Sequence, residues 1–376
     1  MASKPAHDLE PTIEAIETTA YTFATTDDPE QDGTLTWADT TAVVVSARSG
    51  GATGLGWTYS SPVVADFVES KLAPAVVGLA TADVGRANTA MELATRNLGP
   101  GGLAGHARSA VDLALWDLKA RVLGCSLVDL LGATRDEVPV YGSGGFTSLD
   151  DDRLTEQVRG WAEAGMSQVK IKVGRHPEAD EHRLAVVRDA VGPDVALYVD
   201  ANGGYQRAEA ARWAETFAAA GVTWLEEPLT SEDLDGLRML RGKSPPGLAI
   251  AAGEYADGIA AARRLLEAEA VDVLQLDATR CGGITGLLSC EALARAHRTQ
   301  VSAHCAPTAH LAVAAAVPSL RHLEWFHDHV RIERLLFDGA PTAEGGTVSV
   351  DRSALGNGLT LRDDANQFRA SKPDPS

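Results

Sequence analysis

Three acidic residues, Asp200, Glu226 and Glu254, occur 26 and 28 residues apart, each at or shortly after the end of a short apolar run. Any one of them alone could be an ordinary structural acid. Held together without an ion, three carboxylates repel one another and raise one another's pKa values. Mg²⁺ takes oxygen ligands and keeps open positions at which an anionic substrate binds. The three acids therefore predict a Mg²⁺ site, and all-oxygen ligation disfavours zinc.

Candidate acid–base residues lie on both sides of these acids in the sequence. Lys170 and Lys172 alternate by two, so both would point to one face of a strand. A lysine beside another cation and a metal is expected to have a depressed pKa, which suits a general base. Asp277 could hold the His304 imidazole through a hydrogen bond to Nδ1. Glu324 could hydrogen-bond a substrate carboxylate if it is protonated.

A metal between two bases suits the removal of a proton α to a carboxylate, because preorganised charge stabilises the enediolate that forms. The alternative is a set of structural roles. The lysine pair could be a solvated strand end, the histidine a satisfied core residue, and Glu324 part of a buried salt bridge.

Eight short apolar runs would position these residues, and most are separated by amphipathic, helix-like stretches. Strands buried on both faces and separated by helices indicate a parallel sheet, and eight of them predict a (β/α) barrel. The carboxyl ends of barrel strands share one rim, where barrel enzymes have their active sites. The runs are Val138–Tyr141, Gln168–Val173, Ala196–Val199, Thr223–Leu225, Leu248–Ala252, Val273–Leu276, Gln300–Ala303 and His322–Trp325.

The first 130 or so residues have a different pattern, which predicts an antiparallel sheet with helices, an α+β unit. The acidic segment 26–36, with its Pro and Gly, is expected to be a mobile loop. The expected strands are Thr12–Thr25, Thr40–Ala47 and Gly54–Tyr59, and the expected helices are Ser61–Val77, Val84–Leu98 and Ala107–Leu123.

The composition excludes several classes of protein. The chain has 376 residues and a net charge of −19, which argues against nucleic acid or an anionic membrane as a partner. The four cysteines form no CxxC pair and indicate a reduced, cytoplasmic protein. The polar start Met1–Glu10 is no signal peptide, and no apolar run approaches the ~20 residues that span a bilayer.

In this order and at this spacing, the residues resemble the enolase superfamily, and within it the mandelate racemase subgroup. The similar motifs are the KxK of Lys170 and Lys172, DAN at Asp200, WLEEP at Glu226, AGE at Glu254, DATRCGGIT from Asp277, and an ALWD…G…LLG pattern between Ala110 and Gly132. Arg280 departs from the lysine that the family often has at its position. The turn at Ala354–Gly358 is only loosely similar to the family's PGLG.

The resemblance implies a modified (β/α)₇β barrel of the TIM type with an α+β capping domain. The parts would be a cap at 1–135, the barrel at 136–340 and a C-terminal segment at 341–376 that returns to the cap, its tail disordered. It implies Lys172 as the usual base, a His304–Asp277 dyad and Glu324 as the carboxylate-binding acid. It also implies Mg²⁺ as cofactor and a homo-oligomer, either a dimer or an octamer.

Two reactions fit this set of residues. The first is dehydration of an acid sugar to a 2-keto-3-deoxy acid, with His304 as the leaving-group acid; the second is racemisation or epimerisation of an α-substituted carboxylate. A third hypothesis is a non-enzymatic binding module that has kept the fold. Acids in the segment Thr26–Trp37 could reject diacids and favour a monoacid, polyol or cationic substrate, unless they form a solvated loop face. The candidate substrate-binding residues are Arg280, Asn202, Trp57, Tyr59 and His327.

Overall fold

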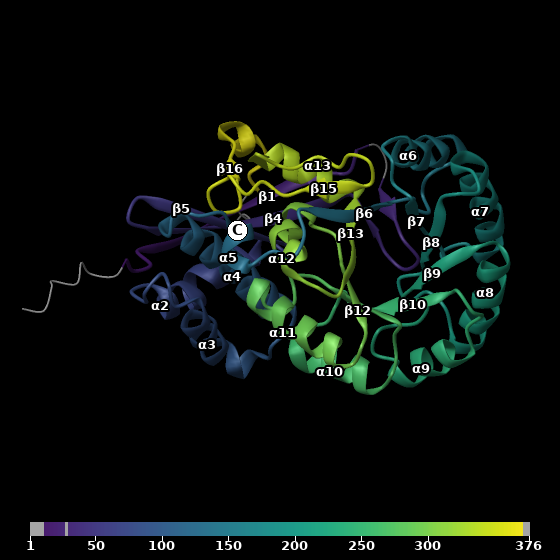
Figure 1. Cartoon of the computed structure of the whole chain (residues 1–376), viewed down its shortest axis with the longest axis horizontal. Coiled ribbons are helices and arrows are strands. Elements are labelled where there is room, and N and C mark those ends of the chain that lie inside the picture. Colours follow the sequence, from purple (N-terminus) through teal and green to yellow (C-terminus); the bar gives the residue numbers. More distant parts are fainter. Residues whose placement is uncertain (1–10, 27–28, 371–376) are drawn as a thin grey trace, which may run out of the picture.

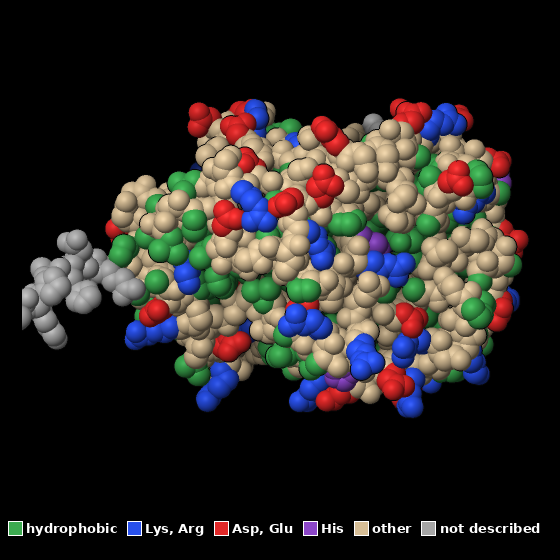
Figure 2. Space-filling model, viewed as in Figure 1, with side chains coloured by type: hydrophobic (Ala, Val, Ile, Leu, Met, Phe, Trp, Pro, Cys, Tyr) green, Lys and Arg blue, Asp and Glu red, His purple; other side chains and the backbone are tan. Residues whose placement is uncertain are grey.

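The chain folds into an α+β cap, a closed barrel and a C-terminal segment that contacts both (Figure 1). This computed structural model describes residues 11–26 and 29–370, so the polar start Met1–Glu10 lies outside it. Within the described ranges, no helix has the length and apolarity needed to cross a membrane. Acidic and basic side chains are interspersed on the face shown in Figure 2.

The cap is built on an antiparallel sheet with strand order β1–β4–β5. The strands are β1 (Ala15–Ala24), β4 (Asp39–Ser49) and β5 (Ala52–Tyr59). Because side chains alternate along β4, Val43 and Val45 pack against the cap helices, while Ala42 and Val44 join the core shared with the barrel. The sheet is therefore buried on both faces, which explains the β-branched run in its sequence.

The cap helices follow the sheet, and the longest of them packs directly on β5. A Cβ atom at Gly54 or Gly56 would lie only 2.3 Å from the backbone of this helix, α4, so only glycine permits the approach. The helices are α1 (Val63–Phe67), the π-helix η1 (Val68–Leu72), α2 (Ala73–Val76), α3 (Val84–Thr95), the 3₁₀ helix η2 (Arg96–Leu98), α4 (Gly102–Val122) and α5 (Leu127–Leu131).

The acidic segment between β1 and β4 differs from the loop that the sequence predicts. Its described residues form a short antiparallel hairpin of β2 (Glu30–Gln31) and β3 (Thr36–Trp37). Asp32 stabilises the turn, because its Oδ1 accepts hydrogen bonds from the backbone N–H groups of Thr34 and Leu35, both at 2.7 Å. Residues 27 and 28 lie outside the described part.

The predicted barrel is confirmed. In the described part of the chain, eight parallel strands lie in sequence order, and pairing of β13 with β6 closes the sheet. The strands are β6 (Glu137–Ser143), β7 (Gln168–Lys172), β8 (Ala196–Asp200), β9 (Val222–Glu226), β10 (Ala249–Ala252), β11 (Val273–Leu276), β12 (Gln300–Ala303) and β13 (Leu320–Phe326).

Helices surround the barrel, while aromatic side chains fill its interior. Tyr141, Tyr198 and Trp224 are buried inside and pack against His322. Together these four rings form an aromatic floor beneath the carboxyl-end rim. The helices are α6 (Asp151–Glu163), α7 (Pro177–Val191), α8 (Arg207–Ala219), α9 (Leu234–Lys243), α10 (Ile259–Glu267), α11 (Gly283–Ala296), α12 (Pro307–Ala316) and α13 (His327–Leu336).

The C-terminal segment connects the barrel to the cap. It contains β14 (Phe337–Asp338), β15 (Thr347–Ser349), β16 (Thr360–Leu361) and the 3₁₀ helix η3 (Asp363–Phe368). β15 pairs with β6 of the barrel, whereas the Ala370 N–H donates to the Ala20 carbonyl of the cap. Residues from Asp363 to 370 are thus folded onto β1, although their polar sequence favours disorder.

Asp117 joins three parts of this interface, which gives a first prediction. This fully buried α4 carboxylate accepts hydrogen bonds from the Leu55 N–H at 2.7 Å, the Asn357 N–H at 2.6 Å and Arg121 Nε at 2.9 Å. Asp117→Ala should lower the free energy of unfolding by about 3 kcal/mol, because it leaves buried donors and a guanidinium without their acceptor. Urea denaturation measures the change.

The exposed Asp189→Ala serves as the control and should change the unfolding free energy by less than about 0.5 kcal/mol. Equal unfolding midpoints for the two variants would contradict this role for Asp117.

Candidate active site

Three carboxylates meet at the carboxyl-end rim of the barrel. Asp200 is the last residue of β8, Glu226 the last residue of β9, and Glu254 follows β10 by two residues. One oxygen from each lies within 4.8 Å of the others, and all three side chains are buried. The strand register places two of these carboxylates side by side, because Asp200 of β8 pairs with Glu226 of β9.

The surroundings orient each carboxylate. Trp224 Nε1 donates to Glu226 Oε2 at 2.9 Å, and Lys170 Nζ donates to Glu226 Oε1 at 2.5 Å. The Asn202 N–H donates to Asp200 Oδ1 at 2.9 Å. Burial and the charge of Asp200 raise the pKa of Glu226 to about 8. Burial also acts to raise the pKa of Asp200, but Lys172 and Lys170 outweigh it and hold that pKa below its ordinary value.

This trio fits a hard divalent cation. The raised pKa of Glu226 reflects repulsion from the neighbouring Asp200 carboxylate as well as burial, and Lys170 and Lys172 do not remove that repulsion. Glu254 Oε2 is buried and accepts no hydrogen bond of acceptable geometry, although His304 Nε2 lies 3.3 Å away. An orphaned buried oxygen among oxygen ligands is what a bound Mg²⁺ would satisfy. Asp200, Glu226 and Glu254 are the residues that would hold it.

The two lysines of β7 have different environments. Lys170 is fully buried and lies 2.5 Å from Glu226, 2.7 Å from Glu324 and 3.6 Å from Asp200. Burial opposes its charge, but these acids raise its pKa well above the ordinary value, so Lys170 is a fixed cation. Lys172, in contrast, lines the cavity and lies 2.5 Å from Asp200.

The pKa of Lys172 differs from the sequence-based expectation of a depressed value. Burial lowers it, but the charge of Asp200 outweighs burial and raises the pKa above its ordinary value. A depressed pKa requires a metal that neutralises Asp200. The carboxylates by themselves therefore keep Lys172 protonated.

The His304–Asp277 pair lies on the other side of the trio. His304 Nδ1 donates to Asp277 Oδ2 at 2.9 Å, and Asp277 Oδ1 accepts the Thr279 N–H at 2.7 Å. Burial lowers the His304 pKa, but Glu254 and Asp277 outweigh it, so the pKa lies above its ordinary value. Arg280 lies 3.5 Å from both Glu254 and Asp277. The fold thus places the His304 imidazole on the opposite side of the trio from Lys172.

Glu324 lies on β13 between these two sides. Its Oε1 accepts Ser143 Oγ–H at 2.5 Å and lies 2.7 Å from Lys170, while Oε2 accepts the Cys305 N–H at 2.9 Å. Burial acts to raise its pKa, but Lys170 and His304 lower it far below the ordinary range. Glu324 is therefore ionised. Its expected hydrogen bond to a substrate carboxylate requires a protonated Glu324, so this structure does not support that role.

A cavity of about 440 Å³ opens above the rim, within the usual size range of small-molecule sites. Lys172, Glu254 and His304 border its inner end. Among the candidate substrate-binding residues, Arg280, Asn202 and Tyr59 also line it. Hydrophobic and polar residues of the cap complete the wall, so the cap forms the outer side of the space in which a substrate would sit.

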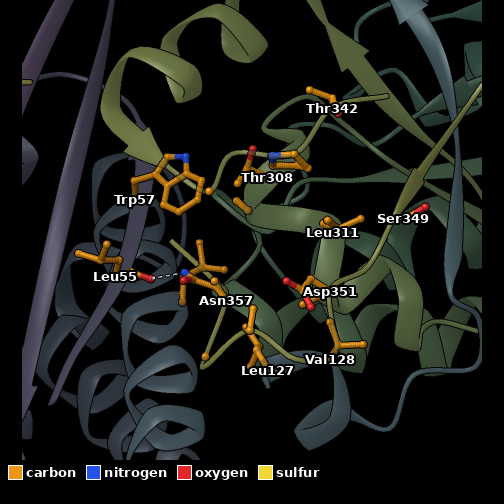
Figure 3. A pocket seen from close by; sticks show the side chains of 18 of the residues that line it. Leu55, Trp57, Leu127, Val128, Thr308, Leu311, Thr342, Ser349, Asp351 and Asn357 are labelled. Atoms are coloured by element: carbon orange, nitrogen blue, oxygen red, sulfur yellow. Dashed lines mark hydrogen bonds between the residues drawn. The ribbon is translucent and has the colours of Figure 1, made fainter. Parts of the chain in front are cut away.

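Trp57 and His327 are placed elsewhere. Trp57 lies at another cavity of about 400 Å³, between the cap and the C-terminal segment, near Thr308 and Asn357 (Figure 3). There its ring packs against Phe337 with centroids 4.6 Å apart. His327 lines a third cavity, together with Glu30. Their roles in substrate binding stay predictions that this arrangement does not support.

Several residues at the rim were missed by sequence reasoning. Asn202 was a candidate, but Glu227, Cys305 and Ala306 were not, and all four adopt positive φ values of 47°, 36°, 50° and 37° within three residues after β8, β9 and β12. Strained backbone of this kind clusters at functional sites. Tyr255 also lines the cavity and was missed. Asp32 and His329 line it too, but Asp32 belongs to the acidic segment that was expected to influence substrate choice, and His329 to the run after the last strand that could contact substrate hydroxyls. Only the adjacency of Glu227 to Glu226 and of Cys305 to His304 was visible as a signal.

Comparison with known proteins shows the same two-part organisation. Residues 15–132 match the N-terminal domain of mandelate racemase and muconate lactonizing enzyme, and residues 153–365 match the enolase C-terminal domain-like family. The chain is 33% identical over 335 residues to L-talarate/galactarate dehydratase of Salmonella typhimurium, covering 87% of this chain and 82% of that protein.

Solved structures agree with the sequence match. A mandelate racemase/muconate lactonizing enzyme-like protein from Rubrobacter xylanophilus has a TM-score of 0.93 and 50% identity, covering 96% of this chain and 100% of that one. A racemase from Streptomyces coelicolor with bound magnesium has a TM-score of 0.88 and 28% identity, covering 95% of this chain and 100% of that one. Members of this group use Mg²⁺, and the carboxylate trio is the group of residues that would hold the ion in this chain. The chain therefore belongs to the mandelate racemase/muconate lactonizing enzyme family of the enolase superfamily.

Proposed function

We propose that this protein removes the proton α to a carboxylate and dehydrates an acid sugar to a 2-keto-3-deoxy acid. The observation that carries the proposal is the placement of Lys172 and His304 at one cavity, on opposite sides of the carboxylate trio. The dehydratase among the relatives supports elimination as the outcome.

Lys172 is the base in this proposal. Asp200, Glu226 and Glu254 would hold Mg²⁺, which would supply positive charge to offset that of the substrate carboxylate and of Asp200, so that the Lys172 pKa would fall. The neutral amine at Lys172 Nζ then takes the α-proton, and the C–H electron pair moves into the enediolate. Lys170 remains charged throughout, since three buried acids surround it.

His304 is the acid. Glu254 and Asp277 raise its pKa above the ordinary value, and Asp277, which is not one of the proposed metal ligands, keeps favouring the protonated imidazole when Glu254 holds a metal. His304 Nε2 donates this proton to the departing β-hydroxyl, which leaves as water while the enediolate electrons form the new double bond. The resulting enol takes up a proton and becomes the 2-keto-3-deoxy acid. Asp277 fixes the ring through Nδ1, so Nε2 faces the cavity.

Racemisation or epimerisation is the second candidate. It uses the same two groups, with one removing the proton and the other returning a proton to the opposite face. A racemase from Streptomyces coelicolor is among the solved structures similar to this chain, which supports racemisation as the second candidate. Incubation in D₂O separates the two outcomes, because dehydration yields a 2-keto-3-deoxy product, whereas racemisation yields inverted substrate with deuterium at the α-carbon.

Glu226→Gln tests the metal site. It should weaken Mg²⁺ binding and lower kcat/KM by at least ~100-fold, because a direct ligand loses its charge and even outer-shell partners cost 10–100-fold. Calorimetric titration with Mg²⁺ and a turnover assay measure both quantities. Glu291→Gln is the matched control, since Glu291 is also buried but bonds Ser319 far from the rim. Normal turnover and metal affinity in Glu226→Gln would refute the ligand assignment.

Lys172→Ala and His304→Asn test the two acid–base roles. Each should lower turnover by roughly 10²–10⁴-fold. In D₂O, proton NMR should show that His304→Asn still exchanges the α-proton, whereas Lys172→Ala does not. The exposed Lys243→Ala and His297→Asn should behave as the unmodified protein. Exchange retained in Lys172→Ala and lost in His304→Asn would instead make His304 the primary base.

Asp277→Asn tests the acid through its pH dependence. The Asp277 charge raises the His304 pKa, and His304 must be protonated to act, so kcat/KM for dehydration should fall as pH rises through that pKa. Removing the charge lowers the pKa, and the alkaline limb of the profile should move to lower pH. Glu291→Gln should leave the limb in place. An unmoved limb in Asp277→Asn would contradict His304 as the acid.

A further inference from the structure

We propose that the substrates are monocarboxylic sugar acids, which bind their carboxylate at the inner end of the cavity and their hydroxylated tail against the cap, and that dicarboxylic sugar acids are rejected. The inference rests on the proposed function and names the substrate class of the same site. It follows from how charge is distributed along the cavity wall.

The positive charges that line the cavity lie at its inner end. Among the described residues that line the cavity, the basic side chains are those of Lys172 and Arg280. Lys172 contacts Asp200, and Arg280 lies 3.5 Å from both Glu254 and Asp277. These two cations therefore belong to the metal and dyad end of the site, where one substrate carboxylate would bind.

The outer wall, supplied by the cap, carries carboxylates and hydroxyl groups instead. Asp32 and Asp39 are its charged residues, and Asp32 is held in place by the two backbone N–H groups of the hairpin turn. The hydroxyl-bearing residues of this wall are Thr40, Thr41, Tyr59, Ser60 and Ser61.

Cationic and imidazole groups behind this wall are already engaged. Arg331 Nη2 lies 2.5 Å from Asp328, whose other oxygen accepts the Thr40 hydroxyl at 2.7 Å. His106 Nδ1 lies 2.8 Å from Ser60 Oγ, and burial lowers its pKa. Burial likewise lowers the pKa of His329 to about 3, and its ring stacks on Tyr59. Both histidines are therefore neutral at pH 7.

Arg175 is a further cation, on the outer side of the hairpin. Its Nη2 donates to the Thr36 hydroxyl at 2.9 Å, in an exposed contact on the hairpin. Arg175 is not among the residues that line the cavity.

This distribution discriminates between the two classes of sugar acid. A carboxylate at the far end of a six-carbon chain would lose water, gain no cationic partner and face Asp32 and Asp39, which repel it. A terminal hydroxyl at the same place can donate to these carboxylates and exchange hydrogen bonds with the threonine and serine hydroxyls. The outer wall therefore selects by repelling a second negative charge as well as by binding hydroxyls.

The test compares pairs of six-carbon sugar acids that share the configuration from C2 to C5 and differ only in C6, a hydroxymethyl group or a carboxylate. With the full chain saturated with Mg²⁺, kcat/KM for the best monocarboxylic acid should exceed that of its dicarboxylic partner by at least ~10-fold, since like-charge contacts oppose binding strongly. Asp39→Asn should narrow this ratio, and Asp39→Arg should narrow it further.

Glu215→Arg on the outer surface of α8 is the control, because it changes the net charge by the same amount as Asp39→Arg but lies away from the cavity. It should leave the ratio unchanged. Two results would overturn the proposed substrate class: equal or faster turnover of the dicarboxylic acids, or a ratio of the two kcat/KM values that is the same in Asp39→Arg as in the unmodified protein. In either case, exchange of the α-proton would still support the proposed function. Absence of α-proton exchange with every acid of both kinds would overturn the proposed function itself.

Discussion

The structure depends on keeping like charges close together inside the rim of a closed barrel. Asp200, Glu226, Glu254 and Glu324 are buried there, and Lys170 and Lys172 supply only part of the balancing charge. Separately, each charge would be costly to bury. Parallel strands in fixed register hold the groups where a divalent cation completes the balance, and the aromatic floor beneath prevents them from relaxing into the barrel. A divalent cation with open coordination positions is also what would make this acidic rim suited to an anionic substrate.

The cap supplies the outer wall of the cavity above this charged rim. It is fixed to the barrel by close packing of α4 on β5 at Gly54 and Gly56, and by the buried Asp117, which bonds both the cap and the C-terminal segment. A cap fixed in this way presents its hairpin and strand ends to the cavity at a constant distance. The inner end of the cavity can then serve the chemistry common to the superfamily, while the cap serves recognition of the rest of the substrate.

The strands and their terminal polar residues could be predicted because their signals are local. An apolar run ending in Asp200 or Glu226 indicates both a buried strand and the residue that reaches the rim. The two misplaced candidates lack such a signal. Trp57 and Tyr59 lie on the same face of β5, but Trp57 is two residues further from the strand end and packs on Phe337 instead of reaching the cavity. Asp32 enters the site only through a hairpin turn that the sequence does not reveal.

The sequence by itself determined the barrel and the arrival of the carboxylate trio, Lys172 and His304 at one rim, because strand period and spacing fix which residues reach that rim. Only the tertiary structure decided their protonation states. Glu324 is ionised because Lys170 and His304 approach it from other strands, and Lys172 is held charged because Asp200 lies beside it. A pKa depends on burial and on neighbours that are distant in sequence, so no local pattern encodes it. The charge of the outer wall is decided in the same way, by which cap residues fold over the rim.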